Sequence, residues 1–391
     1  MTGKIFLKKN EEERLNAGHL WIFSNEIQKI EGEPGIGDTA ELFDSSKQFA
    51  GVGFYNPKSL IAFRLLSKKH VNIDKDFWKD RIERAVAYRK AVYPVIESYR
   101  VVFGESDALP GLIVDKYGNC LAVQFLSAGM EKNSGQIIEA LKEIFKPAGI
   151  IAKNESSLRK LEGLEEKTEI LYGSIPDTLE ITESGLKFSV DLKGGQKTGF
   201  FFDQRDNRQV FSGYCKGKNV LDCFCHTGAF GICAAKAGAK SVMLVDSSKP
   251  AIEKTVENAG LNDVAGTIQA ADADVEEYMQ VQKRSGKKFD IINLDPPALI
   301  KSRKNFFAGV RLYAKLNALA MELLEPGGIL ATSSCSHHLN RDAFLEMLRE
   351  AGGKAGRQFR IMELRSQAKD HPVLLSMPET EYLKFAILKV V

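Results

Sequence analysis

The sequence predicts an α/β protein built around a doubly wound, mainly parallel sheet, preceded by a β-rich domain and an α+β domain. A strand, a glycine-containing turn, a helix and a second strand follow one another between Asn219 and Asp246, and this unit opens such sheets. Strand-like and helix-like apolar runs then alternate to the C-terminus. Short apolar runs between turn signals mark the N-terminal segment. We therefore expect domains at residues 1–68, 69–185 and 186–391.

Composition is typical of a globular protein of two or three domains. Of the 391 residues, 44% are hydrophobic and 27% are charged. The sequence has no apolar run near the roughly 18 residues that a membrane span needs, and its N-terminus lacks the apolar core of a signal peptide. We expect a cytoplasmic protein with no membrane partner. The formal charge of +3 is too small to indicate nucleic acid by itself.

The six cysteines do not form the pattern of a secreted disulfide framework, so we expect reduced thiols. Cys223 and Cys225 are closer together in sequence than the cysteines of the usual zinc knuckle. No metal site is therefore expected. Cys120, Cys215 and Cys233 are expected to be buried structural residues.

Residues 1–68 have the pattern of a small β-rich domain. Turn signals at Gly32, Pro34-Gly35 and Gly37-Asp38 separate its apolar runs. Strands are expected near residues 37–44 and 49–56. By itself, His19 is expected to be a surface or capping residue.

Residues 69–185 combine helices with strands. Residues 77–93 have apolar side chains at helical spacing, with basic side chains between them. We expect the basic side chains to form a solvated face, and contact with RNA is the alternative. These basic residues are Lys79, Arg81, Arg84, Arg89 and Lys90. Further elements are expected at 99–103, 112–115, 120–125, 136–145 and 150–152.

A β-hairpin is expected to lead into the C-terminal domain over residues 186–203. Apolar and polar residues alternate from Leu186 to Leu192, Gly194-Gly195 forms the turn, and Lys197 to Phe202 is the return strand. The three phenylalanines at 200–202 are expected mainly in the core.

The stretch from Asn219 to Asp246 predicts a nucleoside site. Gly228 allows the backbone to approach a ligand at the start of a helix, and an acid at the end of the second strand is suited to the hydroxyls of a ribose. The spaced glycines that hold a pyrophosphate are missing, so S-adenosylmethionine is the expected cofactor. Its contacts on this stretch are expected to be Asp222, Phe224, Thr227, Gly228 and Asp246.

The following strands also end in polar residues, at the edge where open α/β sheets bind ligands. Asp274 is expected to contact the adenine, with Asp272 as the alternative. Gln204 and Arg205 begin the helix before Asn219 and are expected to contact the methionine end of the cofactor. An ordinary helix N-terminus is the alternative for that pair.

Motifs along nearly the whole chain resemble one family, the S-adenosylmethionine-dependent rRNA cytosine-carbon-5 methyltransferases with an N-terminal PUA domain. The residues that carry the resemblance are GHLWIFSNEI, ESDALPGLIVDKYG, KTGFFFDQRDNR, LDCFCHTGAF, DPPALIKSRK, PGGILATSSCSHHL and DHPVLLSMPE. The resemblance implies a PUA domain, a central α+β domain and a class I methyltransferase domain whose last strands are antiparallel. It also implies a 23S rRNA cytosine as substrate and a homodimer as one candidate assembly.

Methylation of cytosine at carbon 5 needs a nucleophile, because this carbon is unreactive until a thiolate adds to the neighbouring ring carbon. Cys335 follows a predicted strand in the SCS stretch at the ligand edge, so we expect it to be that nucleophile. His337 and His338 are close enough in sequence to favour its thiolate.

Asp295 is the second expected catalytic residue, and Asp295 and Pro296 are expected to contact the cofactor as well. A carboxyl at this strand end can hydrogen-bond a flipped pyrimidine. Asp-Pro-Pro also occurs in enzymes that methylate amino groups, where an aromatic residue normally follows. Here Ala298 follows, which favours carbon 5. Some carbon-5 families have a second cysteine directly after the two prolines. This chain has Ala298 there instead, so the group that releases the product stays unassigned.

Residues 301–315 contain five basic residues and no acid, together with Phe306, Phe307 and Tyr313. Basic and aromatic residues together are typical of RNA contact, and an amphipathic helix after a basic loop is the alternative for the aromatic residues. We expect Lys301, Arg303 and Lys304 to bind RNA. An amino-group methyltransferase of RNA and a non-catalytic RNA-binding assembly factor remain the alternative functions.

Overall fold

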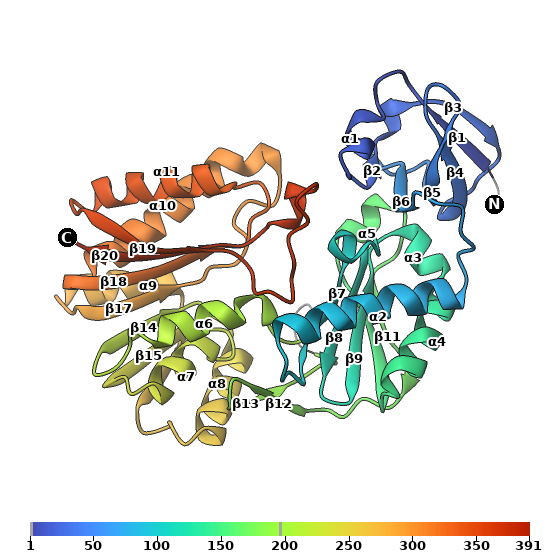
Figure 1. Ribbon diagram of the computed structural model, residues 1–391. Coiled ribbons are helices and arrows are strands. Elements are labelled where there is room, and N and C mark those ends of the chain that lie inside the picture. The colour runs from blue at the N-terminus through green and yellow to red at the C-terminus, as the bar shows by residue number, and fades with distance from the viewer. Residues whose placement is uncertain (1–2, 195–197) are drawn as a thin grey trace. The chain divides into compact units, whose positions relative to one another are not determined.

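The computed structural model describes residues 3–194 and 198–391. The chain forms two compact units, whose helices and strands are labelled in Figure 1. The first unit comprises residues 1–181, 190–202 and 369–380, and the second comprises residues 182–189, 203–368 and 381–391. Apart from residues 182–185, the first two predicted domains lie in the first unit, so their boundary at residue 68 stays a prediction. Among the described residues, no helix has the length and apolar character needed to cross a membrane.

A six-stranded sheet forms the N-terminal part of the first unit, in the order β2-β6-β5-β4-β1-β3. β1, β2, β4, β5 and β6 bury apolar side chains in a shared core that includes Ile5, Leu42 and Phe63, whereas β3 is mostly exposed. The strands expected near 37–44 and 49–56 are confirmed. The elements are β1 (Gly3–Leu7), α1 (Glu13–Asn16), β2 (Trp21–Ile22), β3 (Ile27–Gly32), β4 (Asp38–Phe43), β5 (Phe49–Tyr55) and β6 (Phe63–Ser67).

A five-stranded sheet in the order β11-β10-β9-β8-β7 forms the rest of this unit. The helices α2 and α4 pack on its apolar face, with Trp78 and Leu141 fully buried. The sequence prediction missed β11. The elements are α2 (Lys75–Val92), β7 (Tyr99–Phe103), β8 (Leu112–Tyr117), β9 (Cys120–Phe125), α3 (Ala128–Lys132), α4 (Ser134–Phe145), β10 (Gly149–Asn154), α5 (Leu158–Leu161) and β11 (Lys167–Gly173).

The prediction of a solvated basic face on α2 is wrong for one of the basic residues. Arg89 is 0% exposed, and its guanidinium donates to the carboxylate of Asp107 and, at 3.0 Å, to the carbonyl oxygen of Arg100. A buried guanidinium needs such partners because leaving it unpaired is costly. His19 is also buried, and its Nδ1 accepts from the backbone N–H of Trp21 at 3.1 Å.

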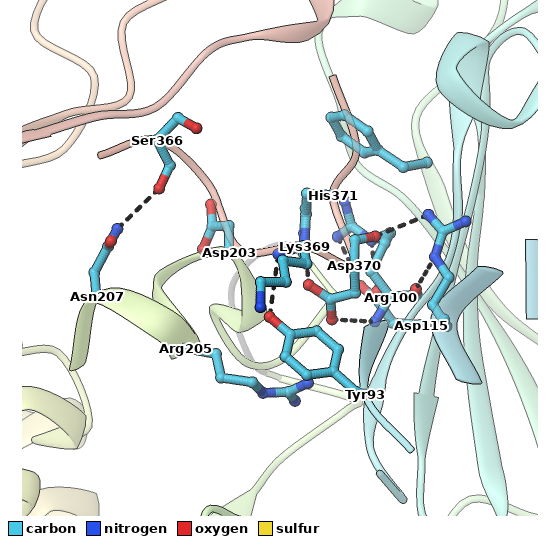
Figure 2. A network of polar contacts seen from close by, with 12 residues as sticks. Tyr93, Arg100, Asp115, Asp203, Arg205, Asn207, Ser366, Lys369, Asp370 and His371 are labelled. Atoms are coloured by element: carbon cyan, nitrogen blue, oxygen red, sulfur yellow. Dashed lines mark hydrogen bonds and ion pairs between the residues drawn. The ribbon is translucent and has the colours of Figure 1, made fainter. Parts of the chain in front are cut away.

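Residues 369–380 belong to the first unit, although they lie late in the sequence. Figure 2 shows Arg100 between two acids: its side chain binds Asp115, with Nε 2.5 Å from Oδ1, and its backbone N–H donates to Asp370 at 3.1 Å. The backbone N–H of Lys369 donates to the hydroxyl of Tyr93 at 3.1 Å. The DHPVLLSMPE motif, which begins at Asp370, is therefore tied to this unit by the hydrogen bond from Arg100.

The hairpin expected over residues 186–203 is wrong. The strand β13 (Leu186–Val190) pairs with β12 (Leu179–Glu183) in a two-stranded sheet. The expected turn at Gly194-Gly195 and the start of the return strand at Lys197 lie partly outside the described residues. From Thr198 to Phe202 there is no strand; instead, the phenol of Tyr117 accepts from the backbone N–H of Phe200 at 2.9 Å.

A seven-stranded sheet in the order β16-β15-β14-β17-β18-β20-β19 forms the second unit and confirms the predicted doubly wound fold. β14 to β18 are parallel, and β20 runs antiparallel to β18 and β19. The strands are β14 (Asn219–Cys223), β15 (Ser241–Asp246), β16 (Ile268–Asp272), β17 (Phe289–Leu294), β18 (Leu324–Ser334), β19 (Phe359–Arg365) and β20 (Lys384–Val390).

Helices cover both faces of this sheet (Figure 1). α9, α10 and α11 share one apolar core with the strands, in which Met279, Tyr313 and Phe344 are buried. The sequence predicted no helix at α9, and it predicted a helix from Tyr313 to Leu324 where α10 begins seven residues earlier, at Phe306. The helices are α6 (Arg205–Ser212), α7 (Ala229–Lys236), α8 (Lys249–Leu261), α9 (Val275–Arg284), α10 (Phe306–Glu322) and α11 (Arg341–Lys354).

Candidate active site

The predicted site residues of the second unit gather at one edge of its sheet. Because β14, β15, β17 and β18 are parallel and paired in register, their carboxyl ends meet at the same edge. β15 ends with Asp246, Asp295 directly follows β17, and Cys335 directly follows β18. The structure therefore brings together the residues for which the sequence predicted cofactor and substrate contacts.

The loop between β14 and α7 has an unusual backbone. Phe224, His226 and Gly228 have φ values of +59°, +49° and +83°, and Gly228 is the N-cap of α7. Thr227 is half-buried, and its carbonyl oxygen accepts from Asn258 at 3.0 Å. Left-handed residues that alternate in this way turn the chain tightly before a helix N-terminus, where backbone N–H groups can face a ligand.

Asp222 lies beneath this loop. Its carboxylate is 1% exposed, accepting at 2.8 Å from the backbone N–H of Gly231 and at 2.8 Å from the side-chain amide of Asn293. Burial raises the pKa of Asp222 to about 7. These contacts tie α7 and β17 to β14, and the predicted contact of Asp222 with the cofactor stays a prediction.

Asp246 is held at the end of β15 by two backbone N–H groups. Oδ2 accepts from His226 and Oδ1 from Ser248, both at 2.9 Å. Each carboxylate oxygen keeps a further lone pair, and the residue is only half-buried. A carboxylate oriented in this way beside a glycine loop has the chemistry to accept from two ribose hydroxyls.

Two exposed acids lie beside Asp246 on the neighbouring strand and helix. Asp272 ends β16 in register with Asp246. Asp274 is the N-cap of α9, and its side chain accepts from the backbone N–H of Glu277 at 2.9 Å. Asp274 therefore has a structural role in α9, whereas Asp272 is the direct strand neighbour of Asp246. Both stay candidates for the adenine contact.

Asp295 is held by polar residues from two other elements. Its Oδ1 accepts from the side-chain amide of Gln204 at 3.1 Å and from the hydroxyl of Ser333. Burial raises the pKa of Asp295 to about 6, so its carboxyl can carry or release a proton near neutral pH. Pro296, which follows it, is buried.

Arg205 has a different environment from its neighbour Gln204. It is 5% exposed, and its Nε donates to Glu183 at 3.0 Å. Arg208 binds the other oxygen of Glu183 at 2.7 Å. The structure thus places the Arg205 guanidinium in a buried ion cluster, and its predicted contact with the methionine end of the cofactor stays a prediction.

Cys335 differs from the other cysteines of the chain. All six are free thiols, and the other five are buried while Cys335 is only half-buried. Burial raises the pKa of both Cys223 and Cys225 well above the ordinary thiol value, so these two nearby thiols are poor nucleophiles. Cys335 is thus the thiol at this edge of the sheet that a substrate can reach.

The residue after Cys335 is held from several sides. The hydroxyl of Ser336 lies 3.0 Å from the phenol of Tyr313 and accepts from the backbone N–H of Ile300 at 3.1 Å. The phenol also donates to the carbonyl oxygen of Pro297 at 3.3 Å. Tyr313 is 0% exposed, so the prediction that it could stack on RNA is wrong. Instead, it links the Asp-Pro-Pro loop to the Cys335 segment.

Both histidines that follow are exposed. The His337 ring stacks on Tyr382, with ring centroids 5.5 Å apart. Their predicted effect on the thiol of Cys335 stays a prediction.

The basic loop between Asp295 and α10 is exposed. Lys301, Arg303 and Lys304 face solvent, and Phe307 in the first turn of α10 is 74% exposed. Among the described residues, these three cations form no ion pair with a carboxylate. The loop therefore combines free positive charge with an exposed ring, which is compatible with contact to a nucleic-acid backbone.

Four polar residues at this site were missed from the sequence, namely Glu183, Asn293, Ser333 and Lys384. The first three bind predicted site residues from another element, and Lys384 binds the carbonyl oxygen of Ser336, directly after Cys335. The sequence contains no local signal for such contacts, because they depend on strand pairing. Lys384, at the start of the antiparallel strand, could have been found only from the order of the strands.

Comparisons with known proteins agree with this geometry. Residues 5–68 match the family model of a PUA-like domain, and residues 156–361 match that of an S-adenosylmethionine-dependent methyltransferase. Two relatives, both called ribosomal RNA large subunit methyltransferase I, come from Tolumonas auensis and Vibrio campbellii. They are 38% and 39% identical over 397 and 396 residues, covering 100% of both chains in each case.

Solved structures show the same fold. A SAM-dependent methyltransferase from Streptococcus mutans is 23% identical with a TM-score of 0.85, and covers 99% of this chain and 100% of its own. A methyltransferase solved in complex with SAH is also 23% identical, with a TM-score of 0.87 and the same coverage.

Proposed function

Because the chain belongs to the S-adenosylmethionine-dependent methyltransferase family, with a PUA-like domain at its N-terminus, we propose that it methylates carbon 5 of a cytosine in large-subunit ribosomal RNA. Relatives named as ribosomal RNA large subunit methyltransferases support the RNA substrate. One observation carries the choice of carbon 5. Cys335, the one cysteine among the described residues that is not buried, directly follows β18, and the neighbouring parallel strand β17 is directly followed by Asp295.

The site residues fit the cofactor. Asp246, fixed by two backbone N–H groups, suits the ribose hydroxyls, and the left-handed loop ending at Gly228 suits close approach of a nucleoside. S-adenosylmethionine supplies the methyl group when bound. Asp272 or Asp274 would hold the adenine edge, and Gln204 and Arg205 are the proposed contacts at the methionine end, with Asp222, Phe224, Thr227 and Pro296 as further contacts.

In the proposed reaction Cys335 activates the substrate. Its thiolate adds to carbon 6 of the flipped cytosine, which turns carbon 5 into a nucleophile. Asp295 hydrogen-bonds or protonates the ring, because its carboxyl titrates near pH 6 and is already oriented by Gln204 and Ser333. After methylation, loss of the carbon-5 proton lets the thiolate leave.

A covalent trap tests this proposal. RNA with 5-fluorocytidine at the target should form a protein–RNA adduct with the wild type, because fluorine cannot leave as a proton does. Cys335→Ser should form no adduct and should not methylate, yet should bind the cofactor as the wild type does. Cys233→Ala removes a buried thiol of the same unit and should keep the adduct.

Two outcomes would refute the carbon-5 proposal. One is near wild-type methylation by Cys335→Ser. The other is a product whose methyl group lies on an amino nitrogen, which the Asp295-Pro296-Pro297 motif would then explain. RNA that carries no methyl group dependent on this protein would point to an assembly factor.

We also propose that the loop at residues 301–304 binds RNA, with the PUA-like domain as a second contact surface. Replacing Lys301, Arg303 and Lys304 with alanine should weaken RNA binding and reduce the slope of affinity against salt, by about 0.7–0.9 for each phosphate that the protein no longer neutralises. A triple variant of Lys216, Lys218 and Lys240 is the control, because these exposed lysines precede β14 and β15 at the opposite edge of the sheet. Equal slopes of affinity against salt for both variants would mean that RNA binds to another surface.

A further inference from the structure

Lys384 is a buried cation beside the proposed nucleophile. It begins β20 and is paired with Ser334, the last residue of β18 before Cys335. The residue is 4% exposed. Its ammonium donates to the carbonyl oxygen of Ser336 at 2.7 Å and to that of Tyr382 at 2.8 Å. Lys384 is therefore paired with the residue before Cys335, and its ammonium binds the carbonyl oxygen of the residue after Cys335.

The charge of Lys384 has no carboxylate partner. In residues 3–194 and 198–391, no aspartate or glutamate forms an ion pair with it. Glu381 lies near but pairs with Arg341 at 2.5 Å. Burying an ammonium without a counter-ion is costly, and two carbonyl contacts alone could be made by a neutral amide. The position of this charge therefore indicates an anion close to it.

We propose that Lys384 is a positioning residue that stabilises the thiolate form of Cys335 and holds the segment after it in place. The inference rests on the proposed role of Cys335 as nucleophile. Two effects follow from one side chain: the cation favours the thiolate, and its hydrogen bond to Ser336 fixes the backbone directly after the sulfur. Lys384 itself stays protonated throughout the reaction and transfers no atom.

Other titratable groups around Cys335 differ in what they can supply. Tyr313 on α10 is neutral, because burial raises its pKa. Asp295 after β17 would oppose a thiolate once it loses its proton. His337 is exposed and stacked on Tyr382, and Glu381 is paired with Arg341. Lys384 comes from the remaining neighbouring strand and provides a positive charge that solvent does not screen.

The pKa of Lys384 agrees with this geometry. Burial lowers it to about 8, while attraction to Cys335 and Glu381 acts in the opposite direction. The side chain is therefore mainly charged at neutral pH, where the thiolate is needed. At higher pH it begins to lose its proton, although formation of the thiolate beside it favours keeping the charge.

The test measures the rate of alkylation of Cys335 by iodoacetamide as a function of pH, with mass spectrometry of the peptide that contains Cys335. Only the thiolate reacts. Lys384→Met should move the midpoint of the profile up by at least one pH unit, so that alkylation at pH 7 slows by about tenfold. Lys384→Arg should keep the midpoint near that of the wild type.

Two more variants separate charge from structure. Lys384→Gln can still donate to the carbonyl oxygens but is neutral, so it should resemble Lys384→Met in its pH profile. Lys389→Met removes an exposed lysine from the same strand and should match the wild type. Cofactor binding, measured by calorimetry, should be equal in all folded variants, because Lys384 is not among the proposed cofactor contacts.

The results distinguish this inference from the proposed function. If folded Lys384→Gln or Lys384→Met has the alkylation profile of the wild type, the inference is wrong, whatever the adduct experiment shows. If the profile moves but the wild type forms no adduct with 5-fluorocytidine RNA, Lys384 acts on a thiol that is not the nucleophile. In that case the proposed function fails while the contact between the two residues stands.

Discussion

Replacing Gly228 with alanine should destabilise the second unit for two separable reasons. Gly228 has a φ of +83°, and holding an alanine in the left-handed region costs about 1–2 kcal/mol. An added Cβ would lie 2.7 Å from Cγ2 of Thr255 and 3.2 Å from Cδ2 of Leu244. Thr255 cannot easily move, because it is 0% exposed and its hydroxyl lies 3.0 Å from the carbonyl oxygens of His226 and Ala251.

Overpacking of this kind costs about 1–3 kcal/mol, so the sum is about 2–5 kcal/mol. Thermal unfolding of the full chain would measure it, with a shift of about 2–4 °C per kcal/mol for a unit of this size. Gly286→Ala is the matched control for the backbone, because Gly286 has a φ of +72° and no atom within 4 Å of an added Cβ.

The double variant Gly228→Ala with Thr255→Ser tests the packing part. Serine lacks the Cγ2 methyl group but keeps the hydroxyl. Gly228→Ala should lose more stability than Gly286→Ala because of the close contact, and the double variant should recover much of that difference. Gly228→Ala should also bind S-adenosylmethionine more weakly, because the loop must shift. If Gly228→Ala is no less stable than Gly286→Ala, or if Thr255→Ser restores nothing, the assignment of this close contact is wrong.

Three further predictions concern charged residues. Asp246→Ala should abolish S-adenosylmethionine binding in calorimetry while the second unit stays folded; equal affinity would remove the ribose assignment. Arg89→Leu should cost about 3–5 kcal/mol of unfolding free energy, because it leaves Asp107 buried without its partner; chemical denaturation would measure this, and a smaller loss would mean that water reaches the carboxylate. Since burial raises the pKa of Asp295 from 3.8 to about 6, its contribution to stability is present below about pH 4 and is lost as pH rises through 6. Between pH 4 and pH 8 the free energy of unfolding of Asp295→Asn should therefore fall by up to about 3 kcal/mol less than that of the wild type. Parallel curves of unfolding free energy against pH would contradict this.

The sheet of the second unit was largely predictable, because its strands are short apolar runs that end in polar residues. The helix α9 was missed, since Val275 and Met279 are its only fully buried residues and most of its other side chains are polar. The start of α10 was missed because Gly309 interrupts the helical pattern. An added Cβ at Gly309 would lie 2.4 Å from Cγ1 of Ile300 and 2.9 Å from the carbonyl oxygen of Leu299. The glycine is there because the helix packs closely on the loop after Asp295.

The errors at polar and aromatic positions have one physical cause. Arg89 was predicted on a solvated face because its neighbours in the helix are basic, yet its partners Asp107 and Asp370 lie far along the chain. Tyr313 was grouped with a basic, aromatic stretch, yet its phenol binds Ser336 and Pro297. Helical periodicity identifies the side that an element buries, but a buried polar group is explained only by partners from other elements.

The direction of β20 explains why the site is larger than the strand ends suggested. The carboxyl ends of the parallel strands carry Asp246, Asp295 and Cys335, the predicted ligand contacts at this edge of the sheet. An antiparallel strand in the same sheet begins where its neighbours end, so its first residue reaches the same edge. Lys384 occupies this position opposite Ser334. Alternation along β20 then turns its next residue, Phe385, to the other face, where it stacks on Phe230 with ring centroids 6.1 Å apart. In a sheet with this strand order, the first residue of the antiparallel strand should therefore be considered for the site together with the last residues of the parallel ones.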